Sequence, residues 1–281
     1  MTMQLPVGYY NSSENFGRLT GCIMKRGKIV NEYIMDDGIR LHIKTDMPKG
    51  FSGKCPLVIV IHGFTGHMEE RHITAVAAML NEIGYATLRV DMYGHGSSGG
   101  KFRDHTLSRW VTNALTVIDY ARTMDFVTDI YLCGHSQGGL TVMLAAGLKR
   151  DVVKGIVPMS PAVVIPEDAR RGSVLGVSFD PDRIPEEIRS PDGWVLDGNY
   201  VRVAQMIRVE DAIDRYPGPV LIVHGDADET IPVRNSVKAA GRYENADLRI
   251  ICGDTHCYDH HLGEAVEAVR LWMTEQLEKN C

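Results

Sequence analysis

Two patterns alternate along the chain after residue 55, and this alternation constrains the fold more than any other feature. Continuous apolar runs, typical of strands buried on both faces, alternate with helical patterns that have one apolar face. The predicted strands are 56–63, 85–91, 129–134, 154–160, 219–225 and 247–253, and the predicted helices are 73–84, 107–124, 137–149, 233–243 and 264–279. We therefore expect an α/β fold with a mostly parallel central sheet and helices on both faces.

The same alternation divides the chain into parts. Residues 28–35 and 39–47 flank an Asp-Asp-Gly turn, which predicts a hairpin of edge strands. A later segment, rich in Pro, Gly and Asp, interrupts the alternation, as an insertion over the edge of the sheet would. The predicted parts are an irregular N-terminal lead (1–25), a core (26–160 and 217–281) and an inserted cap, or lid, over the edge of the sheet (161–216).

Composition and charge exclude several classes of function. The formal net charge is −6, with acidic and basic residues interspersed, so neither nucleic-acid binding nor a polybasic membrane anchor has an electrostatic footprint. No apolar run approaches the ~20 residues of a membrane span, and the first residues lack the apolar centre of a signal peptide. The six cysteines are scattered without a C-x-x-C pair, which favours reduced thiols. We expect a cytoplasmic protein.

Residues 132–140, LCGHSQGGL, place Ser136 between two glycines at a predicted strand-to-helix turn. The segment matches the G-x-S-x-G nucleophile elbow, in which side chains two positions away would collide, so Gly134 and Gly138 fit. The helix that follows adds a partial positive charge where an oxyanion would form. The alternative is a serine that only caps the helix. The strand-turn-helix context favours a nucleophile.

A serine nucleophile needs a base and an acid, and the order of this class along the chain is Ser, Asp or Glu, then His. Asp226 and Asp228 follow the strand 219–225, and His256 follows the strand 247–253. The carboxyl ends of parallel strands meet at one edge of a sheet, so these groups can converge with the serine. Asp228 is favoured because residues 224–232 match the spacing H-G-x-x-D-x-x-[IV]-P, whereas Asp226 is typical of a turn.

Two backbone N–H groups must hold the oxyanion. One is expected directly after the nucleophile, at Gln137. The other is expected in the loop HGFTGH (62–67) after the first buried strand, at Phe64, for which a plain turn is the alternative.

Two further patterns are weaker. His256, His260 and His261 could form a zinc site, but no HExxH motif is present and no carboxylate is clearly placed as a third ligand. The segment 94–99, GHGSSG, matches G-x-G-x-x-G with Asp119 twenty residues on, as in a dinucleotide site. It follows a later strand and no helix begins directly after it, so we interpret it as a tight turn. We expect neither a metal nor an organic cofactor.

The segments HGFTGH, DMYGHGSS, GHSQGG, HGDADETIP and GDTHCYDHH together resemble the α/β-hydrolase fold and, more narrowly, the bacterial feruloyl (cinnamoyl) esterases, from about residue 30 to the end. The resemblance implies Ser136 as nucleophile, His256 as base and Asp228 as its orienting acid. It also implies that the amides of Phe64 and Gln137 form the oxyanion hole. The implied activity is hydrolysis of hydroxycinnamate esters, which are small-molecule substrates, through an acyl-enzyme.

In that family the inserted cap holds the aromatic acyl group, and polar cap residues can hydrogen-bond its phenolic hydroxyl. Asp168 and Tyr200 match such positions, whereas Leu175 stands near a position where some members use glutamine. The alternatives are a general carboxylesterase or monoacylglycerol lipase with the same triad, and a non-catalytic receptor on this fold. The Asp, Pro and Arg content of the cap favours a small, partly polar acyl group. A homodimer is left open.

Overall fold

The structure is a computed structural model that describes residues 23–25, 28–30 and 32–279, with side chains from residue 32 onward. Residues 1–22 of the predicted lead lie outside the described residues. Residues 23–25 form β1 (Ile23–Lys25), which pairs antiparallel with β2 (Lys28–Val30). The prediction of irregular chain is therefore wrong for residues 23–25, because a three-residue strand is too short to show a period.

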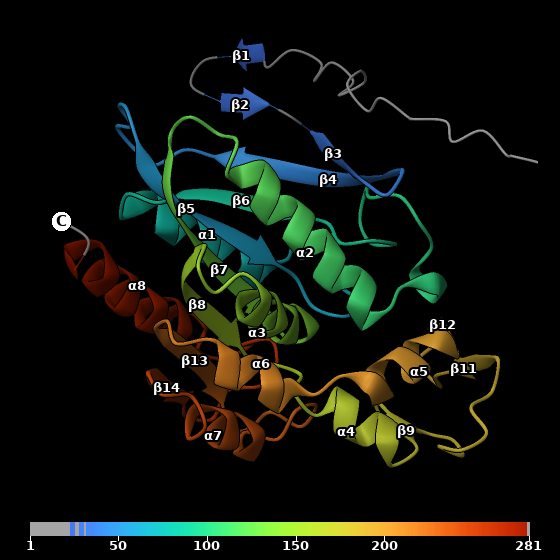
Figure 1. The fold of residues 1–281 in the computed structure, drawn as a ribbon. Helices are drawn as coiled ribbons and strands as arrows, with labels where there is room; N and C mark the ends of the chain where they lie inside the picture. Colours follow the sequence, from blue (N-terminus) through green and yellow to red (C-terminus); the bar gives the residue numbers. More distant parts are fainter. Residues whose placement is uncertain (1–22, 26–27, 31, 280–281) are drawn as a thin grey trace, which may run out of the picture.

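A central sheet of eight strands organises the described chain (Figure 1). The strands are β3 (Tyr33–Asp36), β4 (Ile39–Asp46), β5 (Cys55–Ile61), β6 (Ala86–Val90), β7 (Val127–His135), β8 (Val153–Met159), β13 (Val220–Gly225) and β14 (Ala246–Ile251). Their order is β14-β13-β8-β7-β5-β6-β4-β3, parallel from β14 to β6 and antiparallel at β4 and β3. The predicted α/β fold is confirmed.

The predicted edge hairpin is present as β3 and β4, which pair antiparallel from Tyr33 with His42 to Asp36 with Ile39. Its first strand is shorter than the predicted 28–35, because residues 28–30 form β2, which pairs with β1. Asp37 and Gly38 join them with φ values of 47° and 76°. Positive φ at both central residues matches the twist of a two-residue hairpin, which explains the Asp-Gly sequence here.

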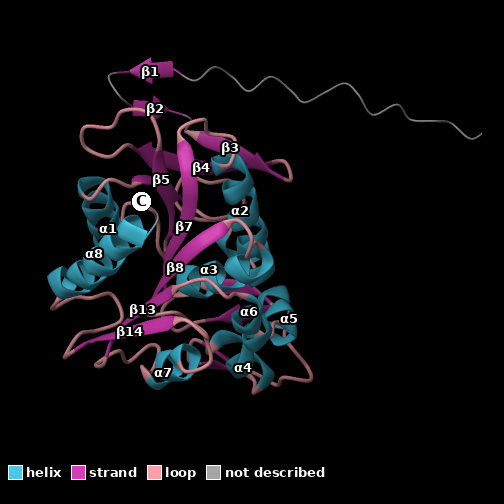
Figure 2. Ribbon diagram, turned by 60° about the vertical axis from the view of Figure 1, so that its left-hand side comes forward, coloured by secondary structure: helices cyan, strands magenta, loops and turns pink. Residues whose placement is uncertain are grey.

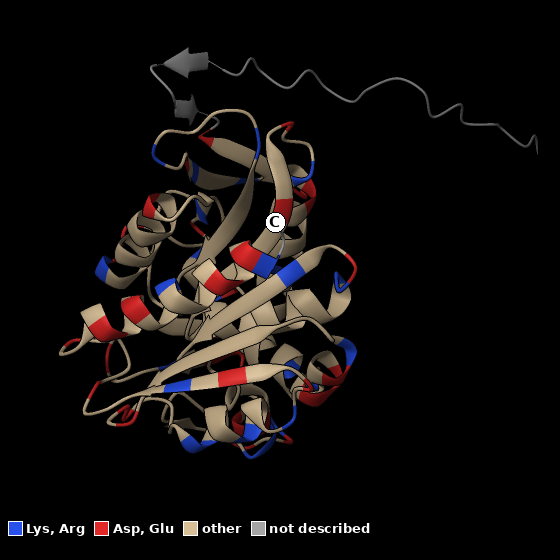
Figure 3. Cartoon of the chain, turned by 90° about the vertical axis from the view of Figure 1, so that its left-hand side faces the viewer, with Lys and Arg blue, Asp and Glu red and all other residues tan. Residues whose placement is uncertain are grey.

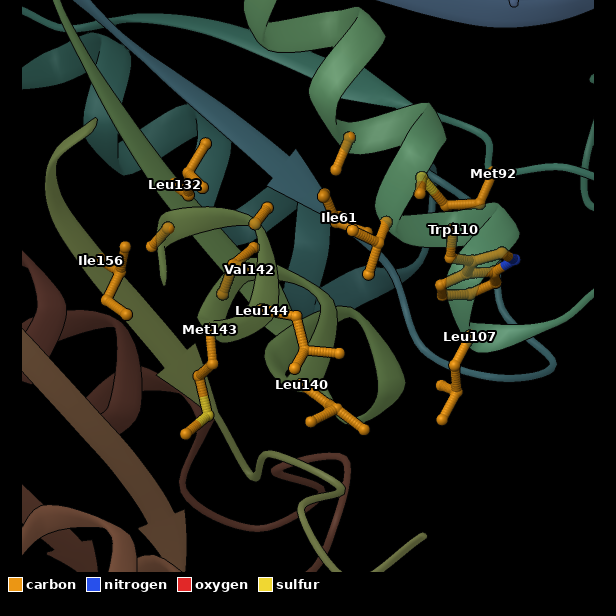
Figure 4. Packing of buried hydrophobic residues seen from close by; sticks show 14 of the residues in the cluster. Ile61, Met92, Leu107, Trp110, Leu132, Leu140, Val142, Met143, Leu144 and Ile156 are labelled. Atoms are coloured by element: carbon orange, nitrogen blue, oxygen red, sulfur yellow. The ribbon is translucent and has the colours of Figure 1, made fainter. Parts of the chain in front are cut away.

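Helices cover both faces of the sheet. The core helices are α1 (Arg71–Glu82), α2 (Leu107–Ala121), α3 (Gln137–Leu148), α7 (Arg234–Ala240) and α8 (Leu262–Lys279). Helices α1 and α8 lie on one face, and α2 and α3 lie on the other (Figure 2). Figure 4 shows how side chains of α3 pack between the sheet and α2: Val142 lies on the side of Leu132 of β7, and Leu140 faces Leu107 of α2. The apolar runs that predicted the inner strands, such as β5 and β13, are thus buried on both sides, whereas the edge strand β14 is largely exposed.

The strand order changes direction between β5 and β7, because the chain passes from β5 to β6 on one side and then returns to β7 on the other. In open α/β sheets, such a switch point is where ligands bind, beyond the carboxyl ends of the strands. Here these ends lead directly into His62 and Gly63 after β5 and into Ser136 after β7.

Residues 161–216 leave the sheet after β8 and return to it at β13, as the predicted insertion does. This inserted segment contains α4 (Ile165–Arg170), β9 (Ser173–Val174), β10 (Val177–Ser178), β11 (Glu187–Arg189), β12 (Val195–Asp197), α5 (Asn199–Met206) and α6 (Val209–Arg215). Most of it gathers at one end of the molecule (Figure 1). Helix α6 instead packs on α3, where a Cβ added to Gly147 would lie 2.8 Å from the Ala212 oxygen.

The surface carries charges of both signs. Figure 3 shows Lys and Arg interspersed with Asp and Glu on helices and loops. Among the residues that the structure describes, no helix combines the length and the apolar character needed to cross a membrane. The four described cysteines are free thiols: Cys55, Cys133, Cys252 and Cys257.

Candidate active site

Ser136 occupies the sharp turn between β7 and α3. Its backbone has φ 54° and ψ −117°, a strained conformation for a residue with a side chain. A Cβ on Gly134 would lie 2.3 Å from the Gly138 oxygen, and a Cβ on Gly138 would lie 2.3 Å from the His62 oxygen. Both glycines are therefore required by sterics, as the elbow pattern predicts. The Ser136 side chain makes no capping hydrogen bond to α3, which argues against the capping alternative.

The Ser136 hydroxyl is hydrogen-bonded to His256. The distance from Ser136 Oγ to His256 Nε2 is 2.9 Å, and His256 Nδ1 lies 2.7 Å from Asp228 Oδ2. The three side chains come from the ends of β7, β13 and β14, which meet at one edge of the sheet. The structure thus brings together the three residues that the sequence singles out, in the arrangement that activates a serine nucleophile.

The surroundings of Asp228 stabilise its carboxylate in the ionised form. Its Oδ1 accepts hydrogen bonds from the amides of Thr230 at 2.9 Å and Ile231 at 2.8 Å. Its Oδ2 lies 2.9 Å from His224 Nε2, whose other ring nitrogen lies 2.6 Å from the Ser236 hydroxyl. Burial opposes the charge, but the hydrogen bonds from His224 and His256 outweigh burial and hold the pKa of Asp228 well below its usual range.

Asp226, the other candidate acid, has a different partner. Its Oδ1 accepts a hydrogen bond from the Gly253 amide at 2.6 Å, which joins the loops after β13 and β14. The side chain is exposed and stabilises a turn, as its sequence position suggests. The hydrogen bond to His256 is made by Asp228.

The two predicted oxyanion donors have free N–H groups. Neither the Phe64 amide nor the Gln137 amide donates a hydrogen bond to any residue within the described ranges. The Gln137 N–H belongs to the same peptide group as the Ser136 carbonyl. That carbonyl oxygen accepts hydrogen bonds from the amides of Leu140 and Ala162, each at 3.0 Å, and these fix the peptide plane. The Gln137 amide is therefore fixed in orientation and available to an incoming oxygen.

The Phe64 amide is fixed by His62, a residue that the sequence did not single out. The Met92 amide donates to His62 Nε2 at 3.0 Å, so the ring proton is on Nδ1. That proton is donated to Gly63 O at 2.7 Å, the carbonyl of the peptide that carries the Phe64 N–H. The sequence signal is the position of His62 as the first residue of HGFTGH (62–67), the loop expected to supply one oxyanion donor.

The inserted segment reaches this site through Tyr200. The buried Tyr200 hydroxyl donates to Gln137 Oε1 at 2.6 Å. Its ring lies 5.9 Å from that of Phe64, and Trp194 of the same segment packs edge-on against Phe64 at 5.4 Å. The structure thus places Tyr200 beside Gln137, the residue that follows the nucleophile, and its hydroxyl proton is donated to the Gln137 side chain.

Asp168 does not lie beside the nucleophile. It borders a cavity of about 480 Å³ between α4, α6 and α7, which also contacts Thr230 and Pro232 after Asp228. Ser136 does not border this cavity, so the structure does not bring Asp168 to the nucleophile. Burial raises the pKa of the Asp168 carboxyl. A role in binding a phenol stays a prediction.

The weaker patterns have structural explanations. His256 is hydrogen-bonded to Ser136 and Asp228, while His260 and His261 are exposed and His261 pairs with Glu264 at 3.3 Å. Over residues 32–279, no three His, Cys, Asp or Glu side chains are arranged to hold a metal. Residues 94–99 form a turn, and Asp119 pairs with Lys149 at 2.8 Å on the surface.

Comparisons with known proteins agree with this geometry. The family model described as serine aminopeptidase, S33, matches residues 54–180. The structure titled "Ferulic Acid bound to Est1E from Butyrivibrio proteoclasticus" is 61% identical with a TM-score of 0.87, covering 88% of this chain and 99% of that one. A second structure of Est1E is 59% identical with a TM-score of 0.84, covering 88% of this chain and 98% of that one.

More distant relatives share the fold. The mitochondrial palmitoyl-protein thioesterase ABHD10 of Bos taurus is 24% identical over 241 residues, which is 80% of this chain and 74% of the relative. The monoacylglycerol lipase of Paleococcus ferrophilus is 22% identical with a TM-score of 0.63, covering 84% of this chain and 98% of that one, a likeness of fold alone.

Fold and site together define a serine hydrolase of the α/β-hydrolase class. Within that class, the chain belongs to the same family as Est1E, and its resemblance to the bacterial feruloyl esterases is confirmed.

Proposed function

We propose that the protein is a serine esterase that hydrolyses hydroxycinnamate esters of the ferulate type. One observation carries the proposal: the Ser136–His256–Asp228 hydrogen bonds are formed in a chain 61% identical to Est1E, whose structure holds ferulic acid. Hydrolysis at such a site passes through an acyl-enzyme and needs no cofactor.

The first half of the reaction acylates the enzyme. His256 Nε2 takes the proton of Ser136 as Oγ attacks the ester carbonyl. The carbonyl oxygen becomes an oxyanion and accepts hydrogen bonds from the amides of Phe64 and Gln137. The bond to the alcohol oxygen then breaks, and His256 gives its proton to the departing alcohol.

The second half releases the acid. Water attacks the acyl group, His256 takes the proton of that water, and the bond to Ser136 Oγ breaks. Ser136 regains its proton from His256, and the hydroxycinnamic acid leaves. Asp228 stays ionised throughout and holds the His256 ring, because its pKa lies well below the working range.

Residues 161–216 are proposed to cap this site. Trp194 and Tyr200 of the segment pack with Phe64 and Phe102 of the core into an aromatic cluster beside the oxyanion loop. Such a cluster suits an aromatic acyl group. Asp168 is proposed to recognise the phenolic hydroxyl, supported by a carboxyl that faces a cavity and forms no ion pair with the described residues.

A general carboxylesterase or monoacylglycerol lipase is the second candidate, because the same triad serves it. A long acyl chain requires a wide apolar channel, whereas the Asp, Pro and Arg content of residues 161–216 favours a small, partly polar acyl group. The hydroxycinnamate proposal is therefore better supported.

We further propose that the enzyme works in the cytoplasm on a small-molecule ester, without a nucleic-acid or membrane partner. The interspersed charges and the accessible free thiols of Cys252 and Cys257 support this. A homodimer is also proposed, supported by the exposed apolar side chains Met206 and Leu148 beside one groove, and light scattering would test it.

Trapping the intermediate tests the proposed chemistry. The protein is mixed with excess methyl ferulate, quenched in acid and digested, and the masses of its peptides are measured by mass spectrometry. The expected result is one feruloyl group on the peptide that contains Ser136, absent from S136A. Ferulate release without an adduct on that peptide, or equal release by S136A, would contradict the mechanism.

A further inference from the structure

We infer that His135, the residue before the nucleophile, is a positioning residue that holds the His256 loop in register with the nucleophile elbow. The inference rests on the proposed esterase function and adds to it, because none of the steps above uses His135.

His135 contacts the backbone of the same residue whose side chain Ser136 contacts. His135 Nε2 lies 2.8 Å from His256 O, and the two rings lie 4.8 Å apart. One residue later, Ser136 Oγ lies 2.9 Å from His256 Nε2. His135 thus binds the main chain of His256, and Ser136 binds its side chain. These two hydrogen bonds together fix the distance between the nucleophile elbow and the His256 loop.

The donor in this contact is the His135 ring. A carbonyl oxygen can only accept, so Nε2 carries the proton. His135 Nδ1 has no partner among the described residues. Burial first, and then the neighbouring rings of His72 and His256, hold the pKa of His135 well below its ordinary value. The ring therefore remains a neutral Nε2–H donor wherever the enzyme works.

The packing around His135 joins three parts of the site. The His72 ring, at the start of α1, lies 4.2 Å away in an edge contact. On the other side, a Cβ added to Gly63 would lie 3.1 Å from His135 Nδ1 and 3.3 Å from Ser136 Cβ. The glycine of the oxyanion loop thus leaves the space that the ring fills. The same ring contacts the oxyanion loop, α1 and the base.

Loss of the donor should lower kcat more than binding. An error of about 1 Å in the placement of a catalytic group can cost about 100-fold in rate. In H135M, which keeps a long side chain without a donor, we expect kcat for methyl ferulate to fall by about 10- to 100-fold. The Kd for ferulate should stay within about twofold, because product binding involves no proton transfer. The KM should change little as well, because His256 acts in both acylation and deacylation and both steps should slow together.

Two further variants separate positioning from packing. H135Q carries an amide N–H that reaches about as far as Nε2, and it should regain most of kcat. H135N carries the same amide on a shorter chain that ends before His256 O, and it should resemble H135M. The exposed His260 supplies the matched control, H260Q, which should behave as the unmodified protein.

The experiment measures kcat, KM, the rate at which a fluorophosphonate labels Ser136, and the melting temperature of each variant. The labelling rate should fall with kcat in H135M and H135N. If H135M is unstable, the H135Q and H135N pair alone decides. A kcat within twofold of the unmodified protein in H135N, or equal impairment of H135Q and H135N at equal stability, would overturn the inference.

Measurements with a second substrate distinguish an error in the role of His135 from an error in the proposed function. If the unmodified protein does not hydrolyse methyl ferulate, the proposed substrate class is wrong. The same series is then compared with p-nitrophenyl butyrate and with fluorophosphonate labelling, which report the Ser136–His256 geometry whatever the natural acyl group.

Discussion

Acidification should destabilise this protein strongly because several histidines are buried without charge. Mainly because they are buried, His72 has its pKa lowered to about 4 and His105 has its pKa lowered to about 3. Burial is also the main reason that the pKa values of His62 and His135 are lowered. All four histidines are buried, with at most 5% of their surface exposed to solvent. They remain neutral in the folded state at pH 5.5, whereas an unfolded chain protonates histidine below about pH 6.5.

The sign and size follow from proton linkage. Below about pH 6.5 the unfolded state binds more protons than the folded state, so the free energy of unfolding falls as the pH falls. Between pH 7.5 and 5.5 each such histidine removes about 1.4 kcal/mol, and four remove about 5 kcal/mol. Carboxylates titrate mostly below this window. Since a typical domain is stable by about 5–15 kcal/mol, the loss is large.

Urea unfolding followed by circular dichroism at pH 7.5, 6.5 and 5.5 measures this loss. The buried His105 packs against Phe64 and Phe102, and H105F should reduce the loss between pH 7.5 and 5.5 by about 1.4 kcal/mol, whatever its effect at pH 7.5. H260Q, which removes an exposed histidine, is the matched control. A total loss below about 1 kcal/mol, or an H105F variant with an unchanged pH dependence, would show that the buried histidines do not cause the destabilisation.

Three further predictions concern the site. D228N should lower kcat by about 10³- to 10⁴-fold with little change in KM for methyl ferulate, because the His256 ring loses its orienting acceptor; a loss below tenfold would exclude Asp228. G138A should destabilise the protein by about 1–3 kcal/mol in urea unfolding, since its Cβ would lie 2.3 Å from the His62 oxygen, and unchanged stability would contradict the steric account. D168N should lower kcat/KM for methyl ferulate by about tenfold but leave methyl cinnamate, which lacks the phenolic hydroxyl, unchanged; equal effects on both esters would remove Asp168 from phenol recognition.

The interior of the sheet was predictable because inner strands such as β5, β6 and β13 are buried on both faces. Such strands are continuous apolar runs, as in 56–61, and they stand out from helices with one apolar face. The short pairs β9–β10 and β11–β12 were not predictable, because strands of two or three residues show no period. Their pairing depends on the segment that surrounds them.

The triad side chains were predictable because each follows a parallel strand at its carboxyl end. The supporting histidines were not, although His62, His135 and His224 stand at similar strand ends. The role of a buried histidine is set by the partners of its two ring nitrogens, which come from distant segments such as Met92 or the His256 loop. A substrate-binding role for Tyr200 stays a prediction, and its Gln137 partner was not predictable because it depends on how the inserted segment folds back.

The most direct test of the account compares kcat/KM for methyl ferulate, p-nitrophenyl butyrate and a C12 monoglyceride, with S136A as the blank. We predict a strong preference for the ferulate, with no activity above the blank in S136A. A preference for the aliphatic esters would keep Ser136 as nucleophile but contradict the aromatic acyl site, and activity that survives in S136A would contradict the account as a whole.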